Sequence, residues 1–113
     1  MPEPSPRSFL CGLDAALRLI GAKWKPLILH FLYSGPKRYG ELKRCVAGVT
    51  DKVLIQQLKD LEAHGVVSRT DHQEIPPRVD YALTEFGRGL ADALKPLCEW
   101  GERQSTRIAR ALS

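Results

Sequence analysis

The sequence lacks the features that mark membrane and secreted proteins. Its longest apolar stretch, residues 27–32, is interrupted by His30 and is far shorter than the roughly 20 apolar residues of a membrane span. The first seven residues lack the basic and then apolar layout of a signal peptide. Three cysteines among 113 residues are too few for a disulfide scaffold. These absences predict a cytoplasmic protein with no membrane partner.

Signatures of catalysis and metal binding are missing as well. The chain has no glycine-rich phosphate loop, no paired carboxylates in a plausible cleft, and no nucleophile with its base and orienting group. The cysteine spacings match no zinc signature, and His30, His64 and His72 have no further ligand at a suitable spacing. We therefore expect no catalytic residue, no metal site and no cofactor, and we predict that the protein is not an enzyme.

What the sequence does contain is an uneven distribution of charge. The net charge is +4, but residues 15–59 carry nine basic and only two acidic residues, a local net charge of +7. The basic residues of this segment are Arg18, Lys23, Lys25, Lys37, Arg38, Lys43, Arg44, Lys52 and Lys59. Such an asymmetry is typical of a surface that binds a polyanion. A set of solvated helix faces without any partner would give the same count.

The spacing of apolar residues predicts four helices before Gly65. The first is indicated by Leu13, Leu17 and Ile20, and the second by the apolar stripe of residues 24–32. A short third helix covers residues 39–46. The fourth covers residues 51–64, with Thr50 as its N-cap and Gly65 as its left-handed stop. Because only a tight turn separates the last two, they form a candidate helix-turn-helix.

After Gly65 the apolar period changes from 3.6 to 2. Residues 66–71 and 78–83 are predicted strands, and residues 72–77 form the tip of the hairpin between them. Thr84 caps a last helix that Pro96 is expected to kink or restart. The predicted fold class is mainly α with a small β-hairpin, a winged helix-turn-helix. Residues 1–10 are expected to form a flexible tail and residues 11–113 a single domain.

The fourth predicted helix has two chemically different sides. At about 100° per residue, Leu54, Leu58 and Leu61 fall on the inner side. The N-terminal end and the outer side carry Thr50, Asp51, Lys52, Ile55, Gln56 and Lys59. Lysine and glutamine can hydrogen-bond base edges, and aliphatic groups can contact the thymine methyl. This pattern is typical of a recognition helix that enters the major groove of double-stranded DNA with its N-terminal half.

Basic residues outside this helix are candidate phosphate contacts. They are Arg38, Lys43 and Arg44 near the third helix, and Arg69 and Arg78 beside the hairpin. Phosphate contacts fix the register of a protein on the duplex without reading sequence. Any one of these side chains could equally be a solvated surface residue. The alternative function at this point is a winged helix that binds another protein and no DNA.

Several motifs resemble those of the HxlR-type family of winged helix-turn-helix regulators, distant relatives of the MarR type. The matching segments are residues 21–25, 35–42, 52–54, 57–58, 61–62, 76–84, 86–87 and 99–101. The resemblance implies a transcription regulator that presents its recognition helices to successive major grooves. Repression is its expected effect on transcription. Ile55 stands where many members have a small hydroxyl residue, so the base preference there does not carry over.

The resemblance also implies a homodimer built from the first and last helices. The candidate dimer residues are Leu13, Leu17, Leu94, Leu97, Trp100 and Ile108. Some members sense oxidants or electrophiles through an N-terminal cysteine, which implies that role for Cys11, with Cys45 as a disulfide partner across the dimer. The start of a helix favours a thiolate at Cys11, whereas Asp14 opposes it. Alternatively, Cys45 and Cys98 are simply small buried apolar residues.

Overall fold

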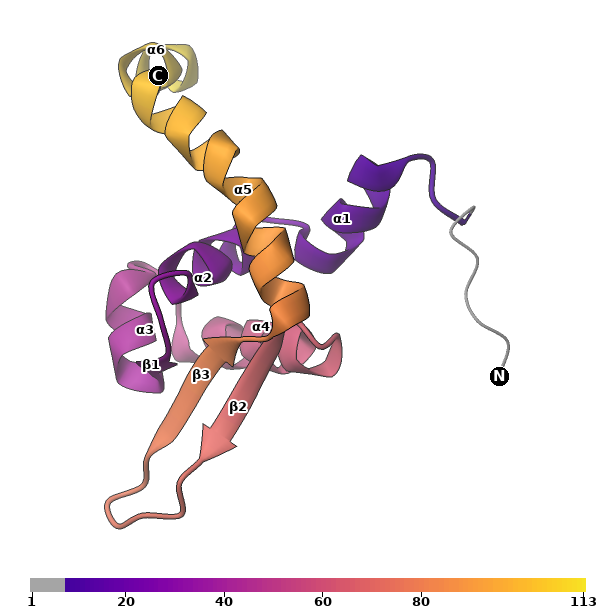
Figure 1. The fold of residues 1–113 in the computed structure, drawn as a ribbon. Helices are drawn as coiled ribbons and strands as arrows, with labels where there is room; N and C mark the ends of the chain where they lie inside the picture. The colour runs from indigo at the N-terminus through magenta and orange to yellow at the C-terminus, as the bar shows by residue number, and fades with distance from the viewer. Residues whose placement is uncertain (1–7) are drawn as a thin grey trace.

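The computed structural model describes residues 8–113, which form helices around a small antiparallel sheet (Figure 1). In chain order the elements are α1 (Gly12–Ile20), α2 (Trp24–Leu32), β1 (Lys37–Arg38), α3 (Tyr39–Cys45), α4 (Asp51–Ala63), β2 (Val67–Asp71), β3 (Val79–Leu83), α5 (Glu85–Arg103) and α6 (Ser105–Leu112). This order of helices and hairpin is the predicted winged helix-turn-helix. The expected tail lies outside the described residues except for residues 8–10.

The helix-turn-helix forms where local sequence signals predicted it. The Thr50 hydroxyl accepts a hydrogen bond from the Val53 N–H at 3.2 Å and so caps α4. At the other end of α4, Gly65 adopts a φ of 73°, a conformation that glycine adopts without strain. The inner leucines of α4, Leu54, Leu58 and Leu61, are fully buried. Both the caps and the buried side of this helix are therefore confirmed.

The sheet has a third strand that the sequence did not predict. Its order is β1-β3-β2, and β3 pairs antiparallel with both neighbours. The two-residue strand β1 is too short for an alternating pattern, so only its partner reveals it. Strands β2 and β3 each start one residue later than expected. For β2 the reason is that the Val66 N–H bonds to the Leu61 carbonyl at 2.9 Å and closes the end of α4.

The hairpin is fastened to α5 at a close backbone contact. Thr84 caps α5 by accepting a hydrogen bond from the Gly87 N–H at 2.9 Å, as predicted. A Cβ atom on Gly87 would lie 1.9 Å from the Val66 carbonyl oxygen. Only glycine fits at this crossing, because any side chain would push α5 off the hairpin. From this crossing α5 packs on α2.

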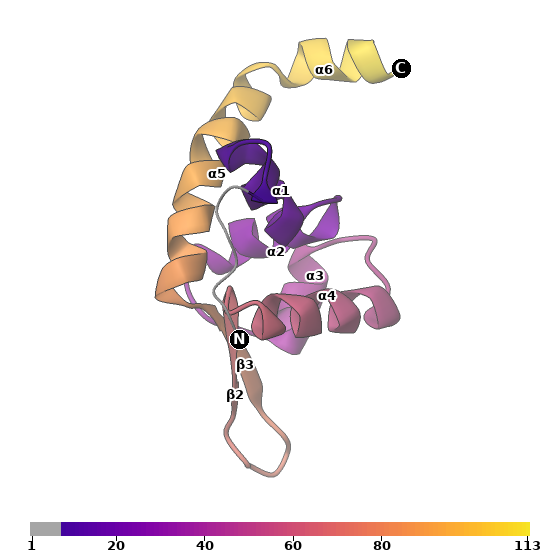
Figure 2. The same cartoon turned by 90° about the vertical axis from the view of Figure 1, so that its right-hand side faces the viewer.

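Of the two outcomes expected at Pro96, a kink or a restart, the restart does not occur. Helix α5 continues through Pro96 to Arg103 and follows a curved path (Figure 2). Proline lacks the N–H that would bond the carbonyl four residues earlier, a loss that an exposed helix can tolerate by bending. The chain breaks instead at Gln104, whose φ and ψ are −104° and 12°.

The two ends of the molecule differ in how much apolar surface they expose. The core lies between α2, α3, α4, the hairpin and the first turns of α5. Helices α1 and α6 and the end of α5 project away from it (Figures 1 and 2). Leu13 and Leu97 there expose 68% and 63% of their surface. In α1, Ile20 is buried and Leu19 packs partly buried against the core, whereas Leu13 and Leu17 are exposed, so this helix is less buried than its period predicted. None of the described helices has the length and apolarity of a membrane span.

Candidate nucleic-acid interface

The outer side of α4 is open to solvent along its first two turns. Lys52, Ile55, Gln56 and Lys59 are all exposed, whereas the leucines of the opposite side are buried. Within residues 8–113, no ion pair reaches Lys52 or Lys59. Both ammonium groups are therefore available to a ligand.

A groove of 500 Å³ runs between α4 and the hairpin. Its lining residues are Tyr39, Ile55, Leu58, Lys59, Glu62, Arg69, Val79 and Tyr81. Arg69 projects from β2 opposite Tyr81 of β3 and lies with Lys59 on this groove. The structure thus brings the predicted cations of the recognition helix and of the wing to one concave surface.

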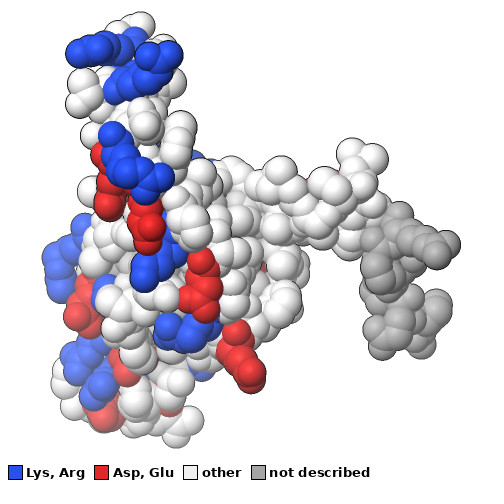
Figure 3. Space-filling model, turned by 45° about the horizontal axis from the view of Figure 1, so that its top comes forward, with Lys and Arg blue, Asp and Glu red and all other residues white. Residues whose placement is uncertain are grey.

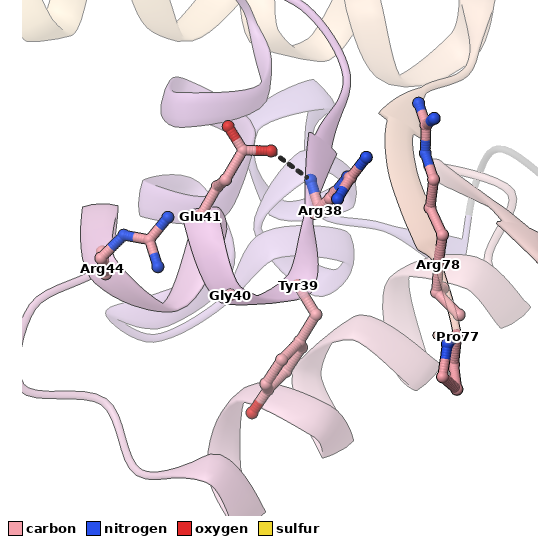
Figure 4. A pocket seen from close by; sticks show the side chains of 8 residues that line it. Arg38, Tyr39, Gly40, Glu41, Arg44, Pro77 and Arg78 are labelled. Carbon is pink, nitrogen blue, oxygen red and sulfur yellow. Dashed lines mark hydrogen bonds between the residues drawn. The ribbon is translucent and has the colours of Figure 1, made fainter. Parts of the chain in front are cut away.

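A second depression, of 760 Å³, lies between the start of α3 and the base of the wing (Figure 4). Its lining residues are Arg38, Tyr39, Gly40, Glu41, Arg44, Pro77, Arg78 and Val79. The Glu41 carboxylate accepts a hydrogen bond from the Arg38 backbone N–H at 3.0 Å, which holds the first turn of α3. The Arg38 and Arg44 guanidinium groups have no ion-pair partner in the described part of the chain.

Arg78, by contrast, is paired within the wing. Its guanidinium lies 3.2 Å from an Asp80 carboxylate oxygen, and the His72 Nε2 lies 2.9 Å from the same oxygen. Hydrogen bonds from Arg78 and His72 lower the pKa of Asp80, and the Asp80 carboxylate raises the pKa of Arg78. This cluster ties the base of the hairpin loop to β3, so Arg78 is a weaker candidate for phosphate than Arg69.

A carboxylate stands at the N-terminal end of α4. The Tyr39 hydroxyl donates a hydrogen bond to Asp51 Oδ1, and the Lys43 Nζ lies 3.5 Å from that oxygen. These partners lower the pKa of Asp51, the Tyr39 hydrogen bond most strongly. Burial and the hydrogen bond to Asp51 raise the pKa of Tyr39 to about 12. Lys43 and Asp51, both predicted DNA contacts, are therefore bonded to each other.

Gln56 is also engaged within the protein. Its side-chain amide donates to Asp60 Oδ1 at 3.0 Å, and Lys25 of α2 pairs with Asp60 at 3.5 Å. One N–H of the amide is used in this way, which leaves the second N–H and the Gln56 carbonyl oxygen for a base. Thr50 is likewise occupied as the N-cap of α4.

Sequence reasoning missed the residues that hold these groups in place. Tyr39 and Asp60 were given no individual role, and Lys25 was counted only among the basic residues. The Tyr39–Asp51 hydrogen bond and the Lys25–Asp60 ion pair join side chains from different helices, so no short-range pattern indicates them. Two short-range spacings could have been found in the sequence. One is Glu41 three residues after Arg38, the spacing of a capping box, and the other is Asp60 four residues after Gln56 within α4.

The candidate dimer residues lie at the other end of the molecule. Leu13, Leu17, Leu97 and Trp100 are exposed, and Leu94 and Ile108 are partly buried, all on α1, α5 or α6. On the face that Figure 3 draws, the projecting part of the chain around α1 shows no charged side chain, beside mixed charges on α5 and α6, although α1 also carries the Arg18–Asp14 ion pair. The dimer contact itself stays a prediction.

The three cysteines are unbridged thiols in different surroundings. Cys11 is exposed just before α1, whereas Cys45 and Cys98 are partly buried. Burial, followed by the charge of Glu102, raises the pKa of the Cys98 thiol. Among residues 8–113 no group of three or more His, Cys, Asp or Glu side chains has the geometry of a metal site.

Comparison with known proteins supports the same architecture. Residues 19–109 match the HxlR-like helix-turn-helix family. The HTH-type transcriptional regulator YkvN of Bacillus subtilis (strain 168) is 48% identical over 95 residues, which cover 84% of this chain and 80% of YkvN.

The solved structures of a redox regulator, HypR, are similar as well. The reduced form superposes with a TM-score of 0.81 at 36% identity, covering 88% of this chain and 99% of HypR. The oxidised form gives a TM-score of 0.78 at 40% identity, covering 82% of this chain and 96% of HypR. The resemblance seen in the sequence motifs is thereby confirmed, and the chain belongs to the HxlR-like helix-turn-helix family.

Proposed function

We propose that the protein is a cytoplasmic transcription regulator that binds duplex DNA sequence-specifically as a homodimer, with repression as its effect. The observation that carries this proposal is the open outer side of α4, where Lys52, Ile55 and Lys59 stand exposed beside the cationic groove of the wing. A helix of this width fits the major groove. The relatives named as transcriptional regulators support the same function.

The interface divides into reading and positioning parts. Lys52 and Ile55 project from the N-terminal half of α4, the part that meets base edges in helix-turn-helix proteins. Arg38 and Arg44 near the start of α3, and Arg69 on the wing, carry charges without partners in the described residues. These three contact phosphates and so set the register.

The homodimer follows from the exposed apolar end of α1, α5 and α6. Several large apolar side chains exposed at one end of a molecule are typical of a protein contact. Two-fold symmetry would place two copies of α4 on successive major grooves of one face of the duplex, about 34 Å apart. The expected binding site is therefore an inverted repeat.

DNA selection tests the proposal directly. Fragments bound by the protein are enriched from a random duplex library, and binding to the winning sequence is measured by fluorescence anisotropy at several salt concentrations. We expect an inverted repeat and an affinity that falls steeply with salt. Absence of any binding at low salt would contradict DNA binding and favour the protein-interaction function.

Lys52→Ala tests the reading helix. We expect it to reduce the preference for the selected sequence over a scrambled duplex by about 1–3 kcal/mol per half-site. Arg110→Ala is the matched control, because it removes one exposed positive charge from α6, at the opposite end of the molecule (Figure 2). An unchanged preference in Lys52→Ala would remove the reading role from this residue.

We further propose that Cys11 makes the regulator responsive to oxidants. Its exposed thiol precedes α1, the helix assigned to the dimer contact, and HypR is named a redox regulator. Hydrogen peroxide would transfer an oxygen atom to the thiol and leave as water, giving a sulfenic acid. A second thiol, with Cys45 of the other subunit as the candidate, would then form a disulfide and release a second water.

The Cys11→Ser variant tests this response. We expect peroxide or a quinone to release the wild-type protein from DNA and to leave the Cys11→Ser complex intact, with Cys98→Ser as the matched control that still responds. A response that persists in Cys11→Ser would exclude Cys11 as the sensor.

A further inference from the structure

Asp51 is the one acidic residue in the first two turns of α4. Its side chain exposes 69% of its surface, on the helix end that enters the major groove in the proposed function. A carboxylate at this place repels the phosphate backbone. It therefore weakens DNA binding unless the bound sequence supplies a hydrogen-bond donor to it.

The carboxylate is held from one side only. The Tyr39 hydroxyl and the Lys43 ammonium both bond to Oδ1. In the described part of the chain, no hydrogen bond or ion pair reaches Oδ2. Figure 4 shows the Tyr39 side chain pointing from the start of α3 toward the neighbouring helix, and its hydroxyl is the group bonded to Oδ1. The second oxygen remains able to accept a hydrogen bond.

Both partners favour a fixed, ionised acceptor. The pKa of Tyr39 is raised to about 12, so at neutral pH its hydroxyl is protonated and donates a hydrogen bond to Asp51. The hydrogen bond from Tyr39 and the charge of Lys43 lower the pKa of Asp51, so the carboxyl group stays ionised. A charged acceptor with a restricted orientation matches an amino group better than a mobile side chain does, since less freedom is lost on binding.

In the major groove, exocyclic amino groups are the donors that bases present. Cytosine offers N4 and adenine N6, whereas guanine and thymine present only acceptors at the corresponding positions. Acidic side chains pair chiefly with cytosine N4. An ionised acceptor at this helix end therefore discriminates against any base pair that places O6, N7 or O4 before it.

We propose that Asp51 is a specificity-determining residue, whose Oδ2 accepts a hydrogen bond from a base amino group while Tyr39 and Lys43 hold its Oδ1. On a sequence without that amino group, the carboxylate repels the duplex. Lys43 has its charge neutralised by Asp51 in both cases and contributes little to phosphate binding. This inference rests on the proposed DNA binding and assigns the chemistry of one position in the site.

Selection of DNA by the Asp51→Asn variant tests the proposal, because asparagine keeps the shape and loses the charge. We expect one base pair per half-site to lose its preference for cytosine or adenine, by about fivefold to tenfold. The preferences at other positions should remain. The wild-type selection itself shows whether the donor is cytosine N4 or adenine N6.

Affinity for random duplex provides an independent readout. Asp51→Asn releases Lys43 to bind phosphate, so random duplex should be bound about fivefold to tenfold more tightly. The slope of log Kobs against log salt concentration should steepen by about 1 per protomer. In the double variant Asp51→Asn with Lys43→Met both changes should disappear, whereas Lys43→Met alone should alter random binding little.

Tyr39→Phe removes the hydrogen bond to Asp51 and leaves every charge in place. It therefore tests whether holding the carboxylate contributes to base preference. We expect a partial loss of preference at the same base pair and an unchanged salt slope, with thermal unfolding as the check that each variant is folded. Identical base preferences and random-duplex affinities in wild type and Asp51→Asn would overturn the proposal. Failure of the wild type to bind any duplex would instead overturn the proposed function.

Discussion

The two ends of the molecule expose opposite kinds of side chain. At the end formed by α3, α4 and the wing, the exposed side chains include several cations, among them Arg44, Lys52 and Arg69. At the end formed by α1, α5 and α6, leucines and Trp100 reach the surface. Unpaired cations attract a polyanion, and exposed apolar groups associate with other apolar groups. One small domain thus has the surfaces for DNA and for a second subunit, separated by its core.

Within the basic end, a second contrast separates paired from unpaired cations. Lys43, Arg78 and Lys25 are each paired with a carboxylate. Arg38, Arg44 and Lys59 have no such partner in residues 8–113. The count of basic residues in the sequence treats all of these alike. The structure shows that only some of their charge is available to phosphate.

Disrupting the apolar end should give the largest effect. Leu97→Asp places a carboxylate on the predicted dimer surface, where Leu97 is already 63% exposed, so the subunit itself should stay folded. We expect a monomer by light scattering and a loss of about 100-fold or more in affinity for the selected inverted repeat, because the two half-sites no longer act together.

Ile75→Asp is the control for this experiment. Ile75 is fully exposed at the wing tip, far from the apolar end, so its replacement adds the same charge without touching the dimer surface. The wild-type molar mass should be retained. A Leu97→Asp protein that remains dimeric would remove this face from the subunit contact.

The contrast between paired and unpaired cations predicts a smaller effect. Arg44→Ala should weaken binding to all duplexes alike and reduce the slope of log Kobs against log salt by about 0.9 per protomer. Lys43→Ala should reduce that slope by less than half as much, because Asp51 already neutralises Lys43. Equal slopes for the two variants would show that the ion pair opens on DNA.

The smallest expected effect concerns the stability of the wing at low pH. Arg78 and His72 lower the pKa of Asp80. The stabilisation by ionised Asp80 is therefore complete at pH values above the normal pKa of an aspartate side chain. It is lost as the pH falls through the lowered pKa of the folded protein. Thermal unfolding should therefore show a difference between wild type and Asp80→Asn at pH 7 that shrinks below about pH 4. A difference that stays constant across this range would contradict the role of the ionised carboxylate.

Local signals explain which parts of the fold could be predicted. The cap at Thr50, the buried leucines of α4 and the left-handed Gly65 all depend on residues within one helix or its ends, and each was predicted correctly. Strand β1 was missed because two residues carry no period. The boundary at Val66 was misplaced because its N–H is bonded to Leu61 of the preceding helix, and its β-branched side chain alone suggested a strand.

The sequence predicted which side chains lie on the outer side of α4, but it did not predict the individual hydrogen bonds of the site. Helical spacing placed Lys52, Ile55 and Lys59 on the outer side of α4 correctly. The i, i+4 spacing of Gln56 and Asp60 allows a hydrogen bond within α4 but does not show that it forms, because that depends on side-chain rotamers. The hydrogen bond from Tyr39 to Asp51 depends on the relative position of α3 and α4, which a one-dimensional pattern does not encode.

Hydrogen–deuterium exchange of the protein with and without its selected duplex tests the assignment of the two ends most directly. Bound DNA slows exchange by covering backbone groups and by restricting local opening. We predict slower exchange in peptides that cover α3, α4 and β2, and unchanged exchange in a peptide that covers α6. Protection confined to α1, α5 and α6, with none in α4, would contradict the account.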